Sequence, residues 1–256
     1  MEQTFTWIKQ LAITHWIAVI FLGNFIAYGI SIGTCIIANR FFSHRKFEWA
    51  LNPVTSKDII LSVIAVILNL MIGVIGWVLW RNDLIKISFP STMRSIFDTV
   101  VLLFCMDFAM YIFHRAAHLR VVYPSVHATH HSHISTNPIS LFVLNPAEVL
   151  GFGGLLILLM MTIPFSGISI IAYLTFNLIF GTMGHLTTEP LPSNAFSFKA
   201  MRLLGTSTFH ALHHQHPNSN FGFYTTIWDR IFGTLDPEYD ERILGSKSFE
   251  TSSPEA

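Results

Sequence analysis

Five long apolar runs, separated by short polar segments, organise this chain. They cover approximately residues 11–37, 59–80, 96–113, 147–163 and 168–184. A helix needs about 20 apolar residues to cross a bilayer, and burial in a soluble core explains one such run more readily than five. The pattern therefore predicts an all-α polytopic membrane protein with about four to five transmembrane helices. We expect one integral membrane domain over residues 1–245 and a disordered polar tail over 246–256.

A short polar sequence, Pro-Phe-Ser-Gly at residues 164–167, separates the last two apolar runs and is typical of a tight turn. These two runs are therefore expected to form a helical hairpin. A hairpin returns the chain to the side from which it came. The segments before Asn145 and after His185 are thus expected to face the same compartment.

Two groups of polar residues predict where helices begin. Ser95 followed by Asp98 fits a capping box at the start of the third run. Asn145, Pro146 and Glu148 fit the N-cap, the first helical residue and the capping-box partner of the fourth run. Both signals place a helix start close to the beginning of an apolar run.

The distribution of positive charge predicts the orientation in the membrane. The first loop carries Arg40, Arg45, Lys46 and Lys57. Loops rich in Lys and Arg remain in the cytoplasm, and if the first three runs all span, the segments around the hairpin are cytoplasmic too. The second loop would then lie outside although it carries Arg81, Lys86 and Arg94. A half-inserted early run remains an alternative.

Composition narrows the class of protein further. Charged residues make up 12% of the chain, about half of what a soluble domain carries. The formal net charge is zero, so no basic surplus exists for nucleic acid. Cys35 and Cys105 both lie within apolar runs, which argues against a disulfide-stapled secreted fold.

Histidine is the unusual residue, with 13 copies in the chain, of which 11 lie between His114 and His216. Most of them occur in three boxes, HRAAH, HATHH and HALHH, and one stands alone after a glycine. The boxes and the single residue contribute His114, His118, His127, His130, His131, His185, His210, His213 and His214. Histidines four apart on a helix lie on one face, where both can reach one metal ion.

Local sequence predicts helices for the two H-x-x-H-H boxes as well. The first box follows the helix start Pro124-Ser125 and precedes the stop Asn137-Pro138. The second follows Ser207-Thr208 and ends at Pro217. Each set of three histidines would then share one helical face. His15 and His44 are interpreted as ordinary polar residues, whereas His133 and His216 are expected behind the ligands or at the surface, with ligation left open.

The number of imidazoles bears on the metal. Nine exceed the four positions of one tetrahedral zinc and suit two metals with open coordination sites, and nitrogen ligands suit iron. The chain has neither the H-E-x-x-H of zinc proteases nor the paired Glu-x-x-His helices of soluble di-iron bundles. A di-metal site beside a bilayer indicates oxygen activation directed at an unreactive lipid C–H bond.

These motifs together resemble the fatty acid hydroxylase superfamily, the sterol desaturase-like membrane di-iron oxygenases. The resemblance covers about residues 107–234 and includes HRAAH, HATHHSH, Gly184-His185, HALHH, Asn220-Phe221-Gly222 and WDRIFGT at 228–234. It implies an enzyme with two iron ions, O2 as co-substrate and an external electron donor, which hydroxylates or desaturates sterols, fatty acyl chains or related lipids. It also implies that the nine histidines named above are the metal ligands, with zinc as a possible substitute for iron.

Four polar residues around the boxes are candidates for supporting roles. Asn145 stands where many relatives have a histidine, and Glu189 stands where some have a second one. Glu189 is expected either to ligate iron or orient His185, or to be an exposed turn residue. Asp107 lies too far along its helix to touch His114 and is expected to line a cavity or pair with a neighbour. Asp229 is expected either to orient a ligand histidine or to pair with Arg230.

Other classes of protein remain in competition with this hypothesis. A membrane zinc hydrolase would need a carboxylate base, for which only Glu189 is well placed. A non-enzymatic metal-binding or transport protein would spread ionisable residues through several spanning runs. The chain has no dinucleotide-binding or haem motif, so we expect a separate ferredoxin or cytochrome with its reductase as electron donor. The substrate, the choice between hydroxylation and desaturation, the oligomeric state and the membrane stay open.

Overall fold

A computed structural model describes residues 9–47 and 52–245 of the chain. Five long helices correspond to the five apolar runs: α2 (Ile13–Phe41), α3 (Ser56–Arg81), α4 (Thr92–Ala117), α6 (Pro146–Thr162) and α7 (Gly167–Gly184). Four of them, α2, α3, α4 and α7, are long and apolar enough to cross a membrane, and α6 is shorter at 17 residues. The predicted all-α polytopic fold is confirmed. The tail over 246–256, expected to be disordered, lies outside the described residues.

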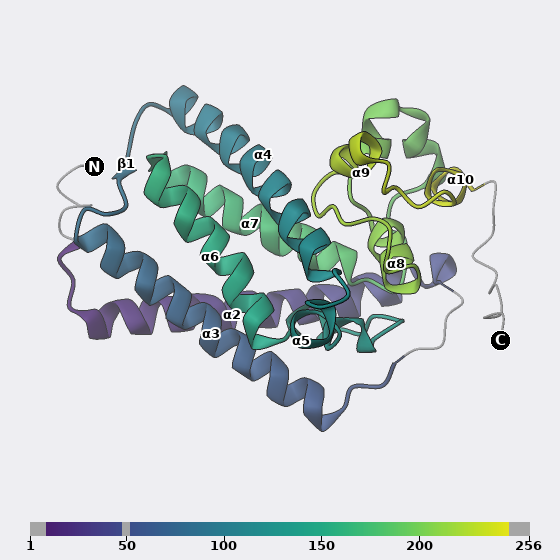
Figure 1. Cartoon of the computed structure of the whole chain (residues 1–256), viewed down its shortest axis with the longest axis horizontal. Helices are drawn as coiled ribbons and strands as arrows, with labels where there is room; N and C mark the ends of the chain where they lie inside the picture. Colours follow the sequence, from purple (N-terminus) through teal and green to yellow (C-terminus); the bar gives the residue numbers. More distant parts are fainter. Residues whose placement is uncertain (1–8, 48–51, 246–256) are drawn as a thin grey trace.

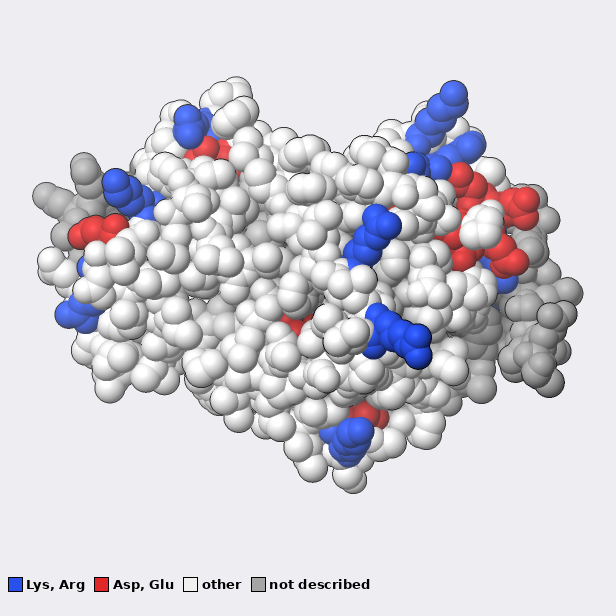
Figure 2. All heavy atoms as spheres, in the orientation of Figure 1, with Lys and Arg blue, Asp and Glu red and all other residues white. Residues whose placement is uncertain are grey.

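The long helices run back and forth along the longest axis of the molecule, so that alternate connections lie at opposite ends (Figure 1). Their outer surfaces are apolar, as Phe25 on α2, Val100 on α4 and Ile171 on α7 illustrate, each at least 60% exposed. A helix surface with so many exposed apolar side chains is typical of a protein whose helices lie in lipid. Figure 2 shows charged side chains at the left end and over the right half of the view, with an almost uncharged surface between these two regions.

The hairpin of α6 and α7 forms as predicted, and its turn contains a short strand. This strand, β2 (Phe165–Ser166), pairs in parallel with β1 (Ile87–Ser88) from the segment between α3 and α4. The capping box expected at Ser95 and Asp98 is wrong, because α4 begins earlier, at Thr92. Asp98 instead accepts a hydrogen bond from the backbone N–H of Ser166 at 3.1 Å. It therefore links α4 to the hairpin turn rather than closing its own helix.

The start of α6 follows the prediction for Asn145. Its side-chain oxygen accepts a hydrogen bond from the backbone N–H of Ala147 at 2.9 Å, and Pro146 is the first helical residue. Helix α3 starts with a capping box of its own, formed by Thr55 and Asp58. Such caps satisfy N–H groups that the first turn leaves unpaired.

The remaining short elements form a cap at one end of the helix bundle, on the right in Figure 1. They are η1 (Ser43–Arg45), α5 (Tyr123–Val126), η2 (His130–Ser132), η3 (Ser140–Phe142), η4 (Ser193–Ser197), η5 (Lys199–Leu203), α8 (Ser207–Gln215), α9 (Ile227–Phe232) and α10 (Tyr239–Ile243). The first loop joins this end too, because the backbone N–H of Phe47 donates to the carbonyl of Thr187. A buried cluster of Phe196, Phe209, Leu212, Tyr239 and Ile243 forms the core of the cap.

Candidate metal centre

The nine histidines singled out by the boxes converge at the junction of the helix bundle and the cap, in two groups. We call them the five-histidine group and the four-histidine group. Within each group the nitrogen atoms that could bind a metal lie within 4.8 Å of one another. The first contains His114, His118, His127, His131 and His213, and the second contains His130, His185, His210 and His214. The segments before and after the α6–α7 hairpin therefore meet at one end of the molecule, as the sequence predicts.

The HATHH box departs from its predicted helix. Helix α5 ends at Val126, and the box continues through a turn into the short 3₁₀ helix η2. The three histidines do not share one site. His127 and His131 belong to the five-histidine group, whereas His130 belongs to the four-histidine group.

The HALHH box lies on a regular helix, α8, as predicted, but it is divided in the same way. His210 and His214 belong to the four-histidine group, and His213 belongs to the other. On a helix each residue advances by about 100°, so residues four apart are separated by about 40° and adjacent residues by about 100°. On α8 the outer pair of histidines therefore serves one group and the middle histidine serves the other, and the HATHH box divides in the same way without forming a regular helix.

Distances within the groups fit metal coordination. The Nε2 atoms of His114 and His127 are 2.9 Å apart, those of His131 and His213 are 3.0 Å apart, and those of His210 and His214 are 3.0 Å apart. Two nitrogen ligands bound at right angles to one metal at about 2.1 Å would be separated by about 3.0 Å. The Nε2 atoms of His118 and His185 are buried and have no hydrogen-bond partner among the described residues. Both groups thus direct nitrogen atoms that lack other partners toward a common point.

Several rings are held through their second nitrogen. His114 Nδ1 donates to the carbonyl of Phe221 at 2.9 Å, and His213 Nδ1 donates to the carbonyl of Ser219 at 2.6 Å. In the other group, His185 Nδ1 donates to the carbonyl of Gly181 at 2.8 Å. A proton fixed on Nδ1 leaves the Nε2 lone pair free for a metal.

The protonation states agree with this geometry. Burial lowers the pKa of His118 to about 2 and that of His131 to about 3, helped by the charge of neighbouring imidazoles, and burial lowers the pKa of His185 to about 4. Burial and neighbouring histidines also hold the pKa of His213 and His214 well below the usual range. These rings are therefore neutral at pH 7, which is the form that binds metals.

Two buried aspartates hold the segment between α8 and α9 against the site. Asp229 accepts hydrogen bonds from the backbone N–H groups of Phe221 and Gly222, both at 2.8 Å. It acts on His114 only through the Phe221 carbonyl, and Arg230 pairs with Asp240 instead. Both expected roles of Asp229 are corrected in this respect, because its oxygens are occupied by backbone and hydroxyl donors.

Asp107 on α4 anchors the same segment at a second point. It accepts hydrogen bonds from the backbone N–H of Tyr224 at 3.0 Å and from Trp228 Nε1 at 3.1 Å. Of the two roles expected for Asp107, lining a cavity or pairing with a neighbour, the structure shows the second. The aspartate belongs to neither histidine group.

Glu189 is buried, so its interpretation as an exposed turn residue is wrong. Its Oε2 accepts hydrogen bonds from the backbone N–H and the hydroxyl of Thr208, at 3.0 and 2.7 Å. This carboxylate stabilises the start of α8, the helix that carries three of the nine histidines. It is not part of either histidine group.

The two remaining histidines near the boxes have partners of their own. His133 Nε2 lies 3.2 Å from Asp58 at the start of α3, and His216 Nδ1 lies 2.6 Å from Asp236. Neither residue belongs to one of the two groups. His133 links the HATHH segment to the start of α3, and His216 links the end of α8 to the segment before α10.

Glu148 is the residue near the centre whose position the sequence did not indicate. Its carboxylate oxygen Oε1 lies 2.7 Å from His127 Nδ1. The motif suggested only a helix cap, and an acidic residue at the beginning of an apolar helix was the one available signal. The contact brings a carboxylate to the five-histidine group.

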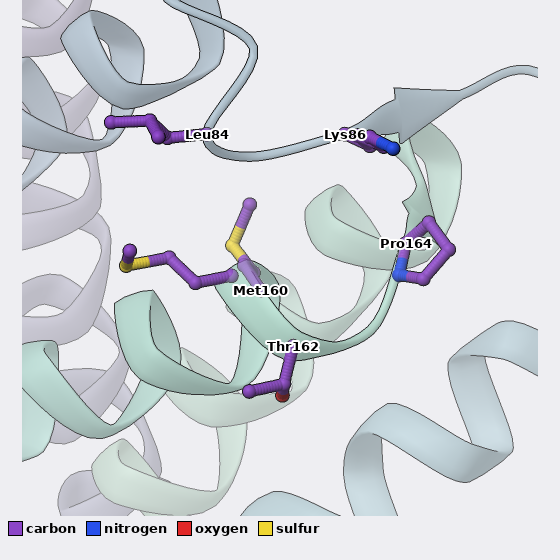
Figure 3. Close-up of a pocket in the computed structure, with 6 residues that line it drawn as sticks. Leu84, Lys86, Met160, Thr162 and Pro164 are labelled. Carbon is purple, nitrogen blue, oxygen red and sulfur yellow. The ribbon is translucent and has the colours of Figure 1, made fainter.

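A small pocket lies at the opposite end of the molecule and takes no part in the centre. Figure 3 shows it between the end of α6 and the segment that leads into β1, with Leu84, Lys86, Met160, Thr162 and Pro164 around it. Its lining contains no histidine. The candidate centre is thus defined by converging side chains rather than by this hollow.

Comparison with known proteins shows which family this chain resembles. The sequence pattern named fatty acid hydroxylase matches residues 99–234, just over half of the chain. The protein CER1-like 1 of Arabidopsis thaliana is 35% identical over 156 residues, which cover 59% of this chain and 25% of that protein. The very-long-chain aldehyde decarbonylase GL1-5 of Oryza sativa subsp. indica is 33% identical over 141 residues, covering 53% of this chain and 23% of that protein.

The match therefore spans about a quarter of the length of these relatives. No solved structure matches the chain. The family match begins in α4 and ends directly after α9, so it includes all nine histidines of the two groups. With the histidine boxes in place over the whole matched region, this chain belongs to the fatty acid hydroxylase family.

Proposed function

We propose that this protein is a membrane-bound di-iron oxygenase that modifies a lipid chain. The observation that carries the proposal is the pair of adjacent, all-nitrogen groups at one end of a bundle of apolar helices. Five and four histidines can each bind one metal and leave coordination positions open. Nitrogen ligands in this number favour iron over a closed tetrahedral zinc site.

The chain's own residues would hold and orient the metals. The nine histidines are the proposed ligands, and the carbonyls of Gly181, Ser219 and Phe221 fix three of the rings. Bound iron would supply the activation of O2 for attack on a C–H bond. Burial of the two groups excludes bulk water from the reacting atoms.

The proposed substrate is an apolar lipid that enters from the bilayer. The surface around the helices is apolar, and α4 and α7 lead directly from it to His114 and His185. The basic first loop lies at the histidine end of the molecule. Following the positive-inside rule, we propose that this end faces the cytoplasm, where a ferredoxin or cytochrome with its reductase supplies electrons.

Hydroxylation is the proposed reaction, with desaturation as the second outcome of the same hydrogen abstraction. The printed names of the rice relatives favour a further candidate, removal of the carbonyl carbon from a very-long-chain aldehyde. All of these reactions require an apolar chain at the metals. They differ in their products and can be separated by mass.

The rival functions have less support. A zinc hydrolase needs a free carboxylate base, and Glu189 is engaged by Thr208 and by the backbone N–H of Leu191. A metal transporter would place its ligands along the helices. The histidines of this chain gather at one end instead.

The experiment is product analysis with purified, iron-reconstituted protein in lipid nanodiscs. It uses a reduced ferredoxin or cytochrome, 18O2, and a panel of fatty acyl, sterol and long-chain aldehyde substrates. A hydroxylase adds 18 mass units, a desaturase removes two, and a decarbonylase shortens the chain by one carbon. The His130→Ala/His213→Ala variant, which removes one histidine from each group, is the control. Absence of any product with every class, or product that persists in the variant, would contradict the proposal.

A further inference from the structure

Glu148 is a buried carboxylate without a positively charged side chain beside it. It lies in the first turn of α6 and is 1% exposed. Its Oε1 lies 2.7 Å from His127 Nδ1, and its Oε2 has no hydrogen-bond partner among the described residues. Burying an ionised carboxylate without compensation is costly. A positive charge near the carboxylate would lower this cost.

Coordination of a metal by the five-histidine group would provide such a positive charge. The opposite nitrogen of the same ring, His127 Nε2, lies 2.9 Å from His114 Nε2, within this group. A divalent ion bound there would act on Glu148 through the imidazole ring. The ion's charge would favour the ionised form of the carboxylate.

The contact distinguishes His127 from the other eight histidines. Within residues 9–47 and 52–245, the three histidine–carboxylate contacts are those of His127, His133 and His216, and only His127 belongs to one of the two groups. Elsewhere the anchoring atoms are backbone carbonyls, as at His185. A carboxylate raises the basicity of an imidazole ligand more than a neutral carbonyl does.

We infer that Glu148 is a positioning residue that holds the His127 ring through Nδ1 and makes the five-histidine group the tighter of the two metal sites. The inference rests on the metal binding in the proposed function. It goes beyond that function because it assigns an order to the two sites. The first equivalent of metal enters the five-histidine group, and the second enters the four-histidine group.

The four-histidine group lacks a comparable contact. In the part of the chain that the structure describes, no carboxylate contacts one of its rings, since the three histidine–carboxylate contacts belong to other residues. Its support comes from the backbone, as where His185 Nδ1 donates to the carbonyl of Gly181 at 2.8 Å. This group therefore has less negative charge behind its ligands than the five-histidine group.

The test is a metal titration of the metal-free full chain in detergent, comparing wild type with Glu148→Gln. The glutamine keeps the shape and one acceptor oxygen but removes the charge. Affinities for Co(II) are followed by ligand-field absorption and Fe(II) environments by Mössbauer spectroscopy. We expect two unequal sites in wild type, and a loss of about 10- to 100-fold in the affinity of the tighter one in the variant. The weaker site should keep its affinity.

The matched control is Asp58→Asn. Asp58 is also a buried carboxylate next to a histidine, 3.2 Å from His133, but outside both groups. This variant should bind both metals as wild type does. A double-mutant cycle with His127→Ala completes the design, since Glu148→Gln should have no further effect once the imidazole is gone.

The outcomes separate the inference from the proposed function. If wild type binds two metals and Glu148→Gln binds them equally well, the inference is wrong and the oxygenase proposal is unaffected. An equal loss in Asp58→Asn, or at both sites, would also overturn it. A wild-type protein that binds no metal would contradict both proposals. Thermal unfolding of each variant without metal shows whether a loss arises from misfolding.

Discussion

The two histidine groups are built from the same boxes, yet their surroundings differ. The five-histidine group is supported by the carbonyls of Phe221 and Ser219 and by the carboxylate of Glu148. In the four-histidine group, the carbonyl of Gly181 anchors His185, and among the described residues no carboxylate contacts a ring. Because both groups share α8 and the segment 127–131, the difference does not come from the ligands. It comes from what lies behind them.

This difference separates the role of the metal ligands from the role of the residues that support them. The ligand set is required at both sites, so its loss should abolish function whichever group is affected. The supporting residues act on one group, so their loss should be selective. Substitutions of the ligands and of the supporting residues test this comparison, and they are considered from the ligands outward.

The largest effect is expected from a single ligand substitution in either group. His213→Ala affects the five-histidine group and His130→Ala the four-histidine group. If the two metals act as one unit, each variant should lower product formation to background, and the double variant should be no worse. Product analysis by mass spectrometry is the measurement. Substantial activity in either single variant would mean that one group works alone.

Acidification should have the next largest effect, on both groups together. Burial lowers the pKa of His118, His131 and His185 to about 2, 3 and 4. The unfolded chain takes up protons below about pH 6.5 and the folded chain does not, so stability is present above that pH and is lost as the pH falls toward 4. We expect the unfolding temperature of the metal-free protein to decrease steadily from pH 7.5 to 5. A pH-independent midpoint would show that these rings take up protons in the folded chain as readily as in the unfolded chain.

The two aspartates that anchor residues 221–228 should differ in selectivity. Asp229→Ala leaves the backbone N–H groups of Phe221 and Gly222 without acceptors and should destabilise the fold by about 3 kcal/mol. It should also weaken metal binding at the five-histidine group, because the Phe221 carbonyl holds His114. Chemical unfolding and metal titration measure the two effects. Equal weakening at both groups would contradict the selective role.

Asp107→Asn is the milder companion of that variant. The asparagine keeps an acceptor oxygen for the backbone N–H of Tyr224 but removes the negative charge that several donors share. A cost of about 1 to 2 kcal/mol is expected, with both metal affinities unchanged. The same two measurements apply. A loss of metal here would indicate that Asp107 contributes to a histidine group more directly than its contacts suggest.

The smallest effect is expected at His216. Its side chain is 46% exposed, and its partner Asp236 also accepts hydrogen bonds from the hydroxyl of Ser219 and the backbone N–H of Glu238. His216→Ala should change stability by less than about 1 kcal/mol and leave both metals in place. The metal content of the purified variant, compared with wild type, tests this prediction. Loss of a metal would add His216 to the ligands.

The sequence predicted which residues meet but not how they divide. Hydropathy located all five long helices, because lipid-facing surfaces need continuous apolar runs. The boxes identified all nine histidines, because that many imidazoles rarely gather for another reason. Their division into five and four depends on rotation around α8 and on the early end of α5 at Val126. Spacing alone does not specify these details.

Contacts between distant segments were the other limit. Glu148 and Asp98 both follow the pattern of local helix caps, yet each contacts a distant segment, at His127 and Ser166 respectively. Asp229 looked like a partner for its neighbour Arg230 and instead binds the backbone of Phe221 and Gly222. Tertiary contacts of this kind override local preference and carry no signature within a short window of sequence.

The central claim is that two separate metal sites share these nine histidines, and metal stoichiometry tests it most directly. Iron and zinc are quantified together in detergent-purified wild type, His213→Ala and His130→Ala, each after reconstitution with iron. We expect about two irons per wild-type chain and, in each single variant, a weakened or lost iron only at the site that contains the substituted histidine, as resolved by Mössbauer spectroscopy. One metal in wild type, or the same site affected in both variants, would contradict the claim.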